Sequence, residues 1–240
     1  MAQSPARKMN HALSTFDSAE DLAREAALRW LDAMAARDLF TVALSGGRIP
    51  KLLYAEVVSQ ASEDAFTNAH FFWGDERCVS PTDEESNFKL AAVRLLLALK
   101  VPEPQVHRIL TERGEAFAVQ QAEAEICRIA DLDETGQPVL DLVFLGLGED
   151  GHVASIFPGD TEAMETQAVY RAVTGPKPPP RRITLGYPAL AAAREVWVLA
   201  AGEGKRDALR ASLAPDGDTP LARVLQSRTH TEIFTDFDLA

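Results

Sequence analysis

Short apolar runs recur along the chain, and most are followed by a stretch whose apolar residues repeat at helical spacing. The apolar runs predict strands at residues 40–44, 70–73, 138–145, 182–185 and 196–200, a weaker strand at 106–110 and an edge strand at 233–234. The spaced apolar residues predict helices at 19–37, 50–60, 90–97 and 115–130, and helices that begin near 188 and 204. Because strands alternate with helices over the whole length, we expect an α/β fold with a doubly wound, mostly parallel, Rossmann-like sheet flanked by helices.

We expect the whole chain, residues 1–240, to form a single domain, with residues 1–14 flexible. A hydrophobic content of 46% is enough for one large core, and no internal repeat or flexible linker divides the sequence. The proline-rich segment 175–180 is too short to separate two domains. The first ten residues lack the apolar stretch of a signal peptide, and no run approaches the roughly 18 apolar residues of a membrane span. We therefore expect a cytoplasmic protein, and we take it to be a monomer.

The net charge of -12 argues against nucleic acid and anionic membranes as partners, because both bind to basic surfaces. An anionic small molecule would instead need a local concentration of arginines, lysines and helix N-termini. Cys78 and Cys127 form no Cys-x-x-Cys pair and are expected to be reduced thiols. No metal site is expected, since the histidines are scattered.

Glycines, an acid and an imidazole directly follow the apolar run at 138–145. His152 therefore comes just past the carboxyl end of a predicted strand, which is where parallel sheets hold their sites. A neutral imidazole can take a proton from water near physiological pH, and Asp150 can orient the ring or stabilise the imidazolium. The alternative is a histidine whose ring nitrogens only satisfy backbone groups.

Gly146, Gly148 and Gly151 also match the dinucleotide-binding fingerprint Gly-x-Gly-x-x-Gly. That fingerprint needs a long helix behind the third glycine, but Phe-Pro-Gly at 157–159 leaves room for one or two turns only. Arg171 stands where the fingerprint needs an acid for the ribose. A dinucleotide is therefore not the favoured ligand.

Ser45, Gly46 and Gly47 lie between a predicted strand and a predicted helix. Such a loop offers free backbone N–H groups, a hydroxyl and the positive end of a helix dipole, which together suit a phosphate. A plain tight turn is the alternative. The Gly-Lys-Ser/Thr ending of a nucleotide P-loop is missing.

Three charged residues lie within the segment 74–77, directly after the predicted strand at 70–73. Charges at the end of a buried strand are costly unless they pair or face a cleft, so Asp75 and Arg77 are candidates for a site. An internal ion pair of Arg77 with a carboxylate is the alternative. The polar loop at 83–87 suits either a helix cap or a functional role.

Arg181, Arg182 and Lys205 lie beside predicted strands and near glycines, where they can add positive charge for a phosphate. Each of them also suits an ordinary surface position. The sequence does not distinguish which of the two adjacent arginines faces a site.

Five segments, taken in order, resemble motifs of the 6-phosphogluconolactonase family. They are Leu-Ser-Gly-Gly at 44–47 with Pro50, Trp-Gly-Asp-Glu-Arg at 73–77 with Glu-Ser-Asn at 85–87, Leu-Gly-Leu-Gly at 145–148 with the segment 150–159, Arg-Ile-Thr-Leu at 182–185, and Gly202 with Lys205. The wider group includes glucosamine-6-phosphate deaminases, which share the fold and the Asp-Gly-His element. After the histidine this chain continues Val-Ala-Ser-Ile-Phe-Pro-Gly, similar to the lactonases, whereas deaminases typically continue Ala-Phe-Asn-Glu-Pro. Ile49 departs from the family, which usually has threonine there.

The resemblance implies hydrolysis of 6-phospho-D-glucono-1,5-lactone to 6-phospho-D-gluconate in the oxidative pentose phosphate pathway, with no metal or organic cofactor. On this basis we expect His152 to be the general base for a water molecule. Arg77 would stabilise the tetrahedral intermediate or hold the substrate, and Asp75 or Asp150 would fix the geometry.

The phosphate of the substrate is expected to bind at Ser45, Gly46 and Gly47 together with Arg182 and Lys205, which supply the local positive field that the acidic chain lacks overall. Three alternatives stay open. They are a glucosamine-6-phosphate deaminase or isomerase, a sugar-phosphate-binding protein without turnover, and an acyl-enzyme route with Ser155 as nucleophile.

Overall fold

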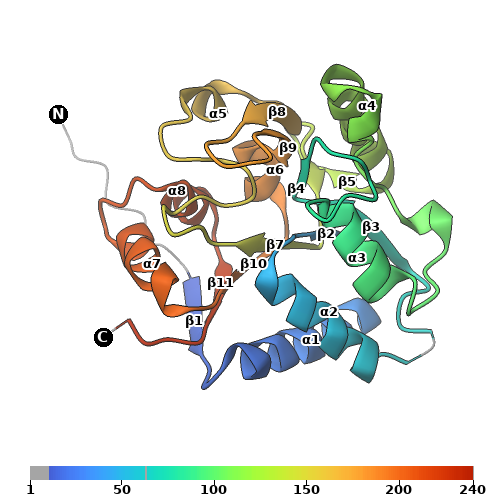
Figure 1. Cartoon of the computed structure of the whole chain (residues 1–240), viewed down its shortest axis with the longest axis horizontal. Helices are drawn as coiled ribbons and strands as arrows, with labels where there is room; N and C mark the ends of the chain where they lie inside the picture. Colours follow the sequence, from blue (N-terminus) through green and yellow to red (C-terminus); the bar gives the residue numbers. More distant parts are fainter. Residues whose placement is uncertain (1–10, 63, 240) are drawn as a thin grey trace.

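A six-stranded parallel sheet forms the centre of the molecule (Figure 1). The structure is a computed structural model and describes residues 11–62 and 64–239. In spatial order the strands are β1 (His11–Thr15), β11 (Thr231–Thr235), β10 (Glu195–Ala200), β7 (Leu142–Gly146), β2 (Phe40–Leu44) and β3 (Ala69–Trp73). The chain passes from β2 to β3 on one side and from β7 to β10 on the other. The strand order thus reverses between β2 and β7, which confirms the doubly wound, mostly parallel sheet and creates a crevice at their carboxyl ends.

Helices cover both faces of this sheet. The helices of the described residues are α1 (Ala19–Ala35), α2 (Arg48–Gln60), α3 (Asn87–Ala91), α4 (Glu115–Ile129), α5 (Thr161–Glu165), α6 (Tyr187–Ala192), α7 (Arg206–Leu213) and α8 (Pro220–Ser227), of which α4 contacts β8 (Tyr170–Thr174) and β9 (Arg181–Leu185) outside this sheet. A π-helical turn over Ala92–Leu96 continues α3, and 3-10 turns lie at Glu103–Gln105, Thr111–Arg113 and Glu203–Lys205. In Figure 1, α1 and α2 lie below the sheet and α6 lies above it. Over the described part of the chain, no helix combines the length and the apolar character that a membrane span requires.

A second, antiparallel sheet lies above the first in Figure 1 and consists of β4 (Asp75–Arg77), β9 (Arg181–Leu185) and β8 (Tyr170–Thr174), in that order. The chain leaves the main sheet at Gly74, whose N–H donates to the carbonyl of Leu44 at 2.9 Å and whose own carbonyl accepts from Leu185 at 2.8 Å. The strand predicted at 182–185 therefore exists but belongs to this second sheet, and β8 was not predicted.

Two predicted strands were too long or misplaced. The run at 138–145 divides into β6 (Pro138–Val139), which pairs with β5 (Asp131–Leu132), and β7. The break falls at Asp141, whose carboxylate accepts hydrogen bonds from the backbone N–H and the hydroxyl of Thr41 at 2.8 and 2.9 Å. The strand predicted at 106–110 reduces to one bridge, between Val106 and Phe71.

Three further expectations are corrected, two at the edge of the sheet and one in a helix. Residues 231–235 form an interior strand and not an edge, because β1 covers it, and residues 11–14 are therefore paired rather than flexible. The remainder of the segment expected to be flexible, residues 1–10, lies outside the described residues. The helix at 90–97 changes to π-helical geometry, which leaves Val93 and Leu97 exposed although their spacing predicted burial.

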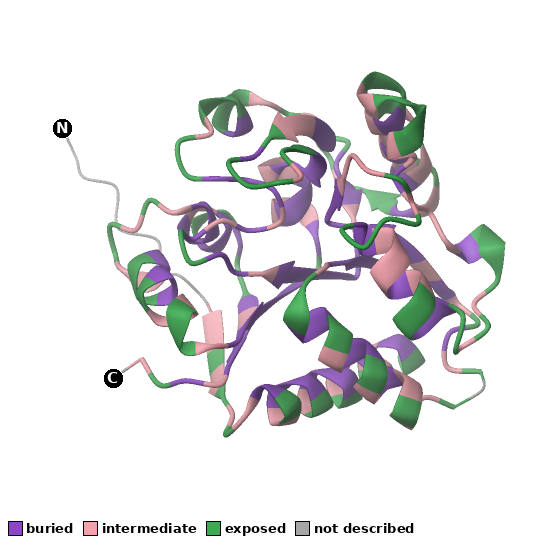
Figure 2. Ribbon diagram, in the orientation of Figure 1, coloured by how far each residue is buried: buried purple, intermediate pink, exposed green. Residues whose placement is uncertain are grey.

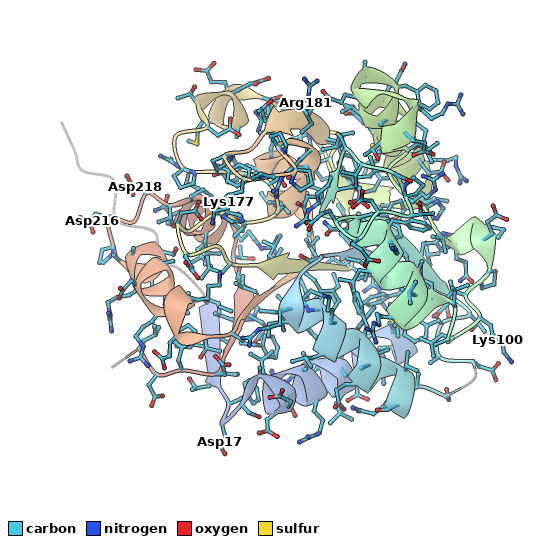
Figure 3. The ribbon with its side chains drawn as sticks, viewed as in Figure 1. Asp17, Lys100, Lys177, Arg181, Asp216 and Asp218 are labelled. Carbon is cyan, nitrogen blue, oxygen red and sulfur yellow. The ribbon has the colours of Figure 1, made fainter. Side chains whose placement is uncertain are left out.

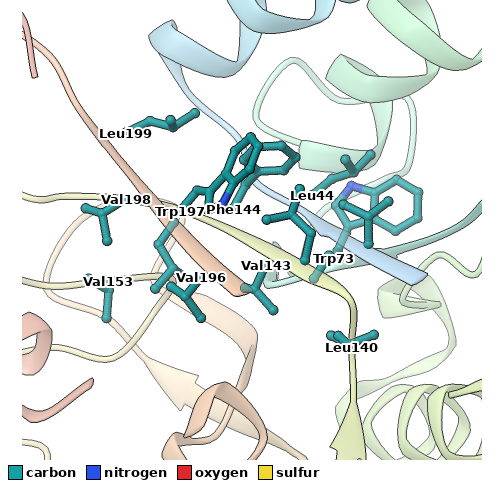
Figure 4. Close-up of a cluster of buried hydrophobic side chains, with 14 of the residues drawn as sticks. Leu44, Trp73, Leu140, Val143, Phe144, Val153, Val196, Trp197, Val198 and Leu199 are labelled. Atoms are coloured by element: carbon teal, nitrogen blue, oxygen red, sulfur yellow. The ribbon is translucent and has the colours of Figure 1, made fainter. Parts of the chain in front are cut away.

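Large aromatic side chains fix the central strands from the face that carries α1. Trp30 meets Phe144 edge to face with ring centroids 4.9 Å apart, and Trp197 meets the same ring at 5.8 Å. Figure 4 shows Phe144 and Trp197 beside Leu44 and Val143, from β2, β7 and β10. Figure 2 shows the buried residues concentrated in the central strands and along the inner faces of the helices. Such a close-packed core holds the strand ends, and so the loops that follow them, in fixed positions.

Candidate active site

A cavity of about 450 Å³ lies at the carboxyl ends of β2, β7 and β10, in the crevice where the strand order reverses. Its lining includes eight of the nine residues that the sequence predicts for the site: Ser45, Gly46, Gly47, Asp75, Arg77, His152, Arg182 and Lys205. The ninth, Asp150, contacts His152 from outside the lining. The fold thus brings together segments that are up to 160 residues apart, from Ser45 to Lys205.

His152 is held from two sides in the loop after β7. Its Nδ1 lies 2.5 Å from Oδ1 of Asp150, and its backbone N–H donates to the same oxygen at 3.2 Å. A Cβ on Gly148 would lie 2.0 Å from Nδ1, so only glycine lets the ring lie there. Gly151 turns the chain between the acid and the histidine with a φ of 84°, a conformation that favours glycine. Among the described residues Nε2 has no hydrogen-bond partner, and the His152 residue lines the cavity.

Asp150 is ionised beside the imidazole. Burial opposes the charge, but the hydrogen bond from His152 and the attraction to its imidazolium form outweigh burial and hold the pKa of the Asp150 carboxyl below its usual range. A carboxylate at Nδ1 favours the tautomer with the proton on that nitrogen. Nε2 is then the nitrogen that can accept a proton.

Asp75 is a buried acid in the cavity wall. Its carboxylate accepts hydrogen bonds from Oγ of Ser155 at 2.6 Å and Nδ2 of Asn87 at 3.2 Å. A Cβ on Gly46 would lie 1.8 Å from Oδ1 of Asn87, so the glycine is needed for the loop after β2 to approach this network. Ser155 is fully buried and does not line the cavity, which is a poor position for a nucleophile.

Glu76, the middle acid of the segment 74–77, organises the polar loop. Its carboxylate accepts from the backbone N–H groups of Arg77, Asn87 and Phe88 at 2.7 to 2.8 Å, and from the hydroxyl of Ser86 at 3.1 Å. Burial raises the pKa of Glu76, and these backbone hydrogen bonds oppose the rise. The loop at 83–87 is therefore a helix cap, as one of the two interpretations predicted, and it also supplies Asn87 to the site wall.

Arg77 and Arg182 face each other across β4 and β9 and both line the cavity. Arg77 donates to the carbonyl of Glu85 at 2.8 Å and lies 3.5 Å from its carboxylate. Arg182 is 6% exposed and, within residues 11–62 and 64–239, donates only to the carbonyls of Pro179 and Lys177. Burial, and then the charge of Arg77, lower the pKa of Arg182. Over the described residues Arg182 has no carboxylate in ion-pair range, so an anion in the cavity would supply its counter-charge.

The neighbouring Arg181 points the other way. It forms an ion pair with Glu115 of α4. Figure 3 shows Arg181 at the outside of the molecule, beyond the small sheet. Successive residues of a strand point to opposite faces, so only Arg182 can face the cavity. The structure thereby distinguishes the two arginines.

The Ser45–Gly47 loop leads into α2, which begins at Arg48, two residues before the predicted start at Pro50. Gly47 precedes the helix with a φ of 104° and supplies no side-chain cap, so the first N–H groups of α2 are left for another acceptor. The Tyr54 hydroxyl donates to the carbonyl of Ser45 at 2.7 Å and fixes the loop from below. Lys205 lines the cavity from the 3-10 turn after β10.

Sequence reasoning missed two charged residues of the lining, Arg48 and Glu149. A basic residue in the first turn of a helix opposes the helix dipole, and this mismatch at Arg48 is a signal that an anion site is nearby. The Arg48 guanidinium lies against Gly202, which has a φ of 98°, and a Cβ at this glycine would lie only 3.2 Å from Nη2. No comparable signal marks Glu149. In the part of the chain that the structure describes, no group of three or more His, Cys, Asp or Glu side chains is placed to hold a metal ion.

A sequence model of the family described as glucosamine-6-phosphate isomerases/6-phosphogluconolactonase matches residues 14–234. The chain belongs to this family. Among its relatives is the 6-phosphogluconolactonase of Mycobacterium tuberculosis, 35% identical over 218 residues, which are 85% of this chain and 87% of the relative. The 6-phosphogluconolactonase of Streptomyces coelicolor is 36% identical over 209 residues, 83% of this chain and 80% of the relative.

Solved structures of family members share the whole fold. The 6-phosphogluconolactonase of Trypanosoma brucei superposes with a TM-score of 0.84 at 27% identity, covering 94% of this chain and 95% of the other. A monomeric glucosamine-6-phosphate deaminase also superposes, with a TM-score of 0.79 at 16% identity, covering 94% and 96% of the two chains. At that identity the deaminase supports the shared fold alone.

Proposed function

We propose that this chain hydrolyses 6-phospho-D-glucono-1,5-lactone to 6-phospho-D-gluconate, a step of the oxidative pentose phosphate pathway. The observation that carries the proposal is the pairing of His152 with Asp150 at a cavity that also presents Arg77 and Arg182. An oriented imidazole and nearby cations are what water attack on a carbonyl of an anionic substrate requires. The names of the relatives, at 35 and 36% identity over most of the chain, point to the same reaction.

In the proposed mechanism, Nε2 of His152 takes a proton from water as the water oxygen bonds to C1 of the lactone. The carbonyl electron pair moves onto its oxygen, and Arg77 stabilises the resulting negative charge. The intermediate then breaks the bond between C1 and the ring oxygen, which receives the proton from the imidazolium. The acid formed ionises and releases a proton. General-base catalysis of this kind contributes roughly a hundredfold to ten-thousandfold.

We assign the orientation of His152 to Asp150, because Asp150 contacts Nδ1 while Asp75 is engaged by Ser155 and Asn87. The role proposed for Asp75 is to fix the cavity wall next to the two arginines. Its negative charge also opposes the lowering of the pKa of Arg182.

The phosphate is proposed to bind at the N-terminus of α2, where Ser45, Gly46 and Gly47 offer backbone N–H groups and a hydroxyl. Lys205 and Arg182 line the same cavity and would add charge-assisted hydrogen bonds. Ile49 has no hydroxyl to offer to the phosphate, so backbone groups must serve in its place.

We further propose that the chain acts as a single domain, as a cytoplasmic monomer, and without nucleic acid as a partner. The single domain rests on the continuous alternation of strands and helices along the sequence, and the absence of a nucleic-acid partner rests on the net charge of -12. Sedimentation analysis of the purified chain would test the monomer.

The proposed reaction is tested by supplying two substrates to the purified chain. Freshly generated 6-phosphogluconolactone should release acid faster than its spontaneous hydrolysis, and glucosamine 6-phosphate should release no ammonia. Ammonia release without lactone hydrolysis would favour the deaminase alternative. Binding of 6-phosphogluconate without turnover of either substrate would favour a sugar-phosphate-binding protein.

A further inference from the structure

Phe157 lies directly behind the cavity and contacts two of its functional side chains. Its ring centroid is 4.8 Å from that of His152, with the planes inclined by 40°. The guanidinium carbon of Arg182 lies 5.6 Å from the same ring centroid. Phe157 is 8% exposed and does not line the cavity, so it would not touch a substrate bound there.

Gly175 makes the position of this ring possible. A Cβ at Gly175 would lie 2.8 Å from Cε2 and 2.9 Å from Cζ of Phe157, closer than real contacts allow. Gly175 is not among the glycines with positive φ, so its backbone does not itself demand glycine. The missing side chain therefore serves the packing of the ring, in a loop held closed by the hydrogen bond from the Gly175 N–H to the carbonyl of Pro180 at 2.7 Å.

The remaining contacts of the two partners show why a ring is needed here. His152 is fixed at Nδ1 by Asp150 and lies against Gly148, so Phe157 is the neighbour that limits tilting of the imidazole. In the part of the chain that the structure describes, Arg182 donates to backbone carbonyls only, and the negative face of an aromatic ring favours a nearby guanidinium.

We propose that Phe157 is a positioning residue that holds His152 and Arg182 in one fixed relative geometry, so that the proton-accepting group and an anion-binding group act on the same bound molecule. The catalytic part of this inference rests on the lactonase function proposed above. The geometric part concerns only the two side chains and holds for any anionic ligand of the cavity.

Two substitutions test the proposal from different sides. Phe157→Leu keeps an apolar side chain but removes the ring. Gly175→Ala keeps the ring, but the added methyl group on the neighbouring loop pushes it out of place. Both should lower kcat for 6-phosphogluconolactone by about tenfold to a hundredfold, the scale of a misplacement of roughly 1 Å. Both should also raise KM a few-fold as the contact with Arg182 is lost. Phe66→Leu, which removes a buried ring that packs on Trp30 and Phe71, is the matched control and should change neither.

Two readouts do not depend on turnover. In NMR spectra the NOEs from the ring protons of His152 to the protons of Gly148 and Asp150 should weaken in Phe157→Leu and in Gly175→Ala, but not in Phe66→Leu, because an imidazole that can tilt loses its fixed distances to these neighbours. Calorimetric titration with 6-phosphogluconate should show weaker binding in the first two variants only.

The outcomes separate the two proposals. Loss of stability with unchanged kcat, KM and His152 NOEs in folded Phe157→Leu and Gly175→Ala would overturn the positioning role and leave Phe157 as ordinary packing. If the wild type does not accelerate lactone hydrolysis, the proposed function fails, and the NOEs and the titration still decide whether Phe157 holds the two side chains.

Discussion

Replacing Asp150 with asparagine tests how the acid assists His152. The substitution keeps the size of the side chain and removes its negative charge. Asp150 lies 2.5 Å from Nδ1 of His152 but does not line the cavity. Its loss should therefore change the protonation step and leave substrate binding largely intact.

The magnitude follows from the charge that forms on His152 during the reaction. A carboxylate about 4 Å from the centre of an imidazolium stabilises it by about 1 kcal/mol in water and about 4 kcal/mol at the effective dielectric constant of a protein surface. The side chain of Asp150 is 37% exposed, so solvent screening puts the expected loss between these limits, at about 1.5 to 2.5 kcal/mol. That corresponds to a fall in kcat of roughly ten- to seventyfold.

The assay is the initial rate of acid release from freshly generated lactone over a range of concentrations, with the spontaneous rate subtracted. Asp216→Asn, at an exposed position in the loop between α7 and α8, makes the same change in net charge and is the control. Asp150→Asn should lower kcat and change KM by less than about twofold. An unchanged kcat, or a rise in KM alone, would refute the role given to Asp150.

Three further results are expected. Lys205→Ala should raise KM for the phosphorylated lactone by about tenfold and change turnover of phosphate-free glucono-1,5-lactone by less than about twofold; equal losses on both would contradict a phosphate contact. Arg228→Met should lower the free energy of unfolding, measured in urea, by about 3 kcal/mol without changing kcat, because the buried guanidinium donates to backbone carbonyls at the end of α6. A loss below about 1 kcal/mol would mean that water hydrogen-bonds to these carbonyls in the variant. The free energy of unfolding of the wild type should also fall as the pH is lowered from about 7 to about 5. Burial lowers the pKa of His70 and His107 in the folded chain, so the unfolded chain binds protons in this range that the folded chain does not. His107→Gln should show a shallower fall, and equal slopes would exclude this source.

The central strands could be predicted because each is a continuous apolar run buried on both faces. β8 could not, since its Arg171 is an unlikely residue for a buried strand until Asp160 is seen 2.6 Å away. β1 was missed because its pairing with β11 joins residues about 220 positions apart. Such long-range partners leave no trace in local periodicity.

The candidate site could be predicted largely from motifs at the ends of strands. The choice between Arg181 and Arg182 could not, because it depends on which face of β9 meets the cavity and which meets Glu115. The contact of Phe157 with His152 and Arg182 was also beyond the sequence, since the ring lies where two loops from different strands meet.

The most direct test of the account compares the wild type with His152→Ala in hydrolysis of freshly generated 6-phosphogluconolactone, with circular dichroism to verify the fold of both. We predict clear acceleration by the wild type and a loss of roughly a hundredfold or more in the variant. Acceleration that survives in a folded His152→Ala variant would remove His152 from the reaction, and no acceleration by the wild type would contradict the proposed function itself.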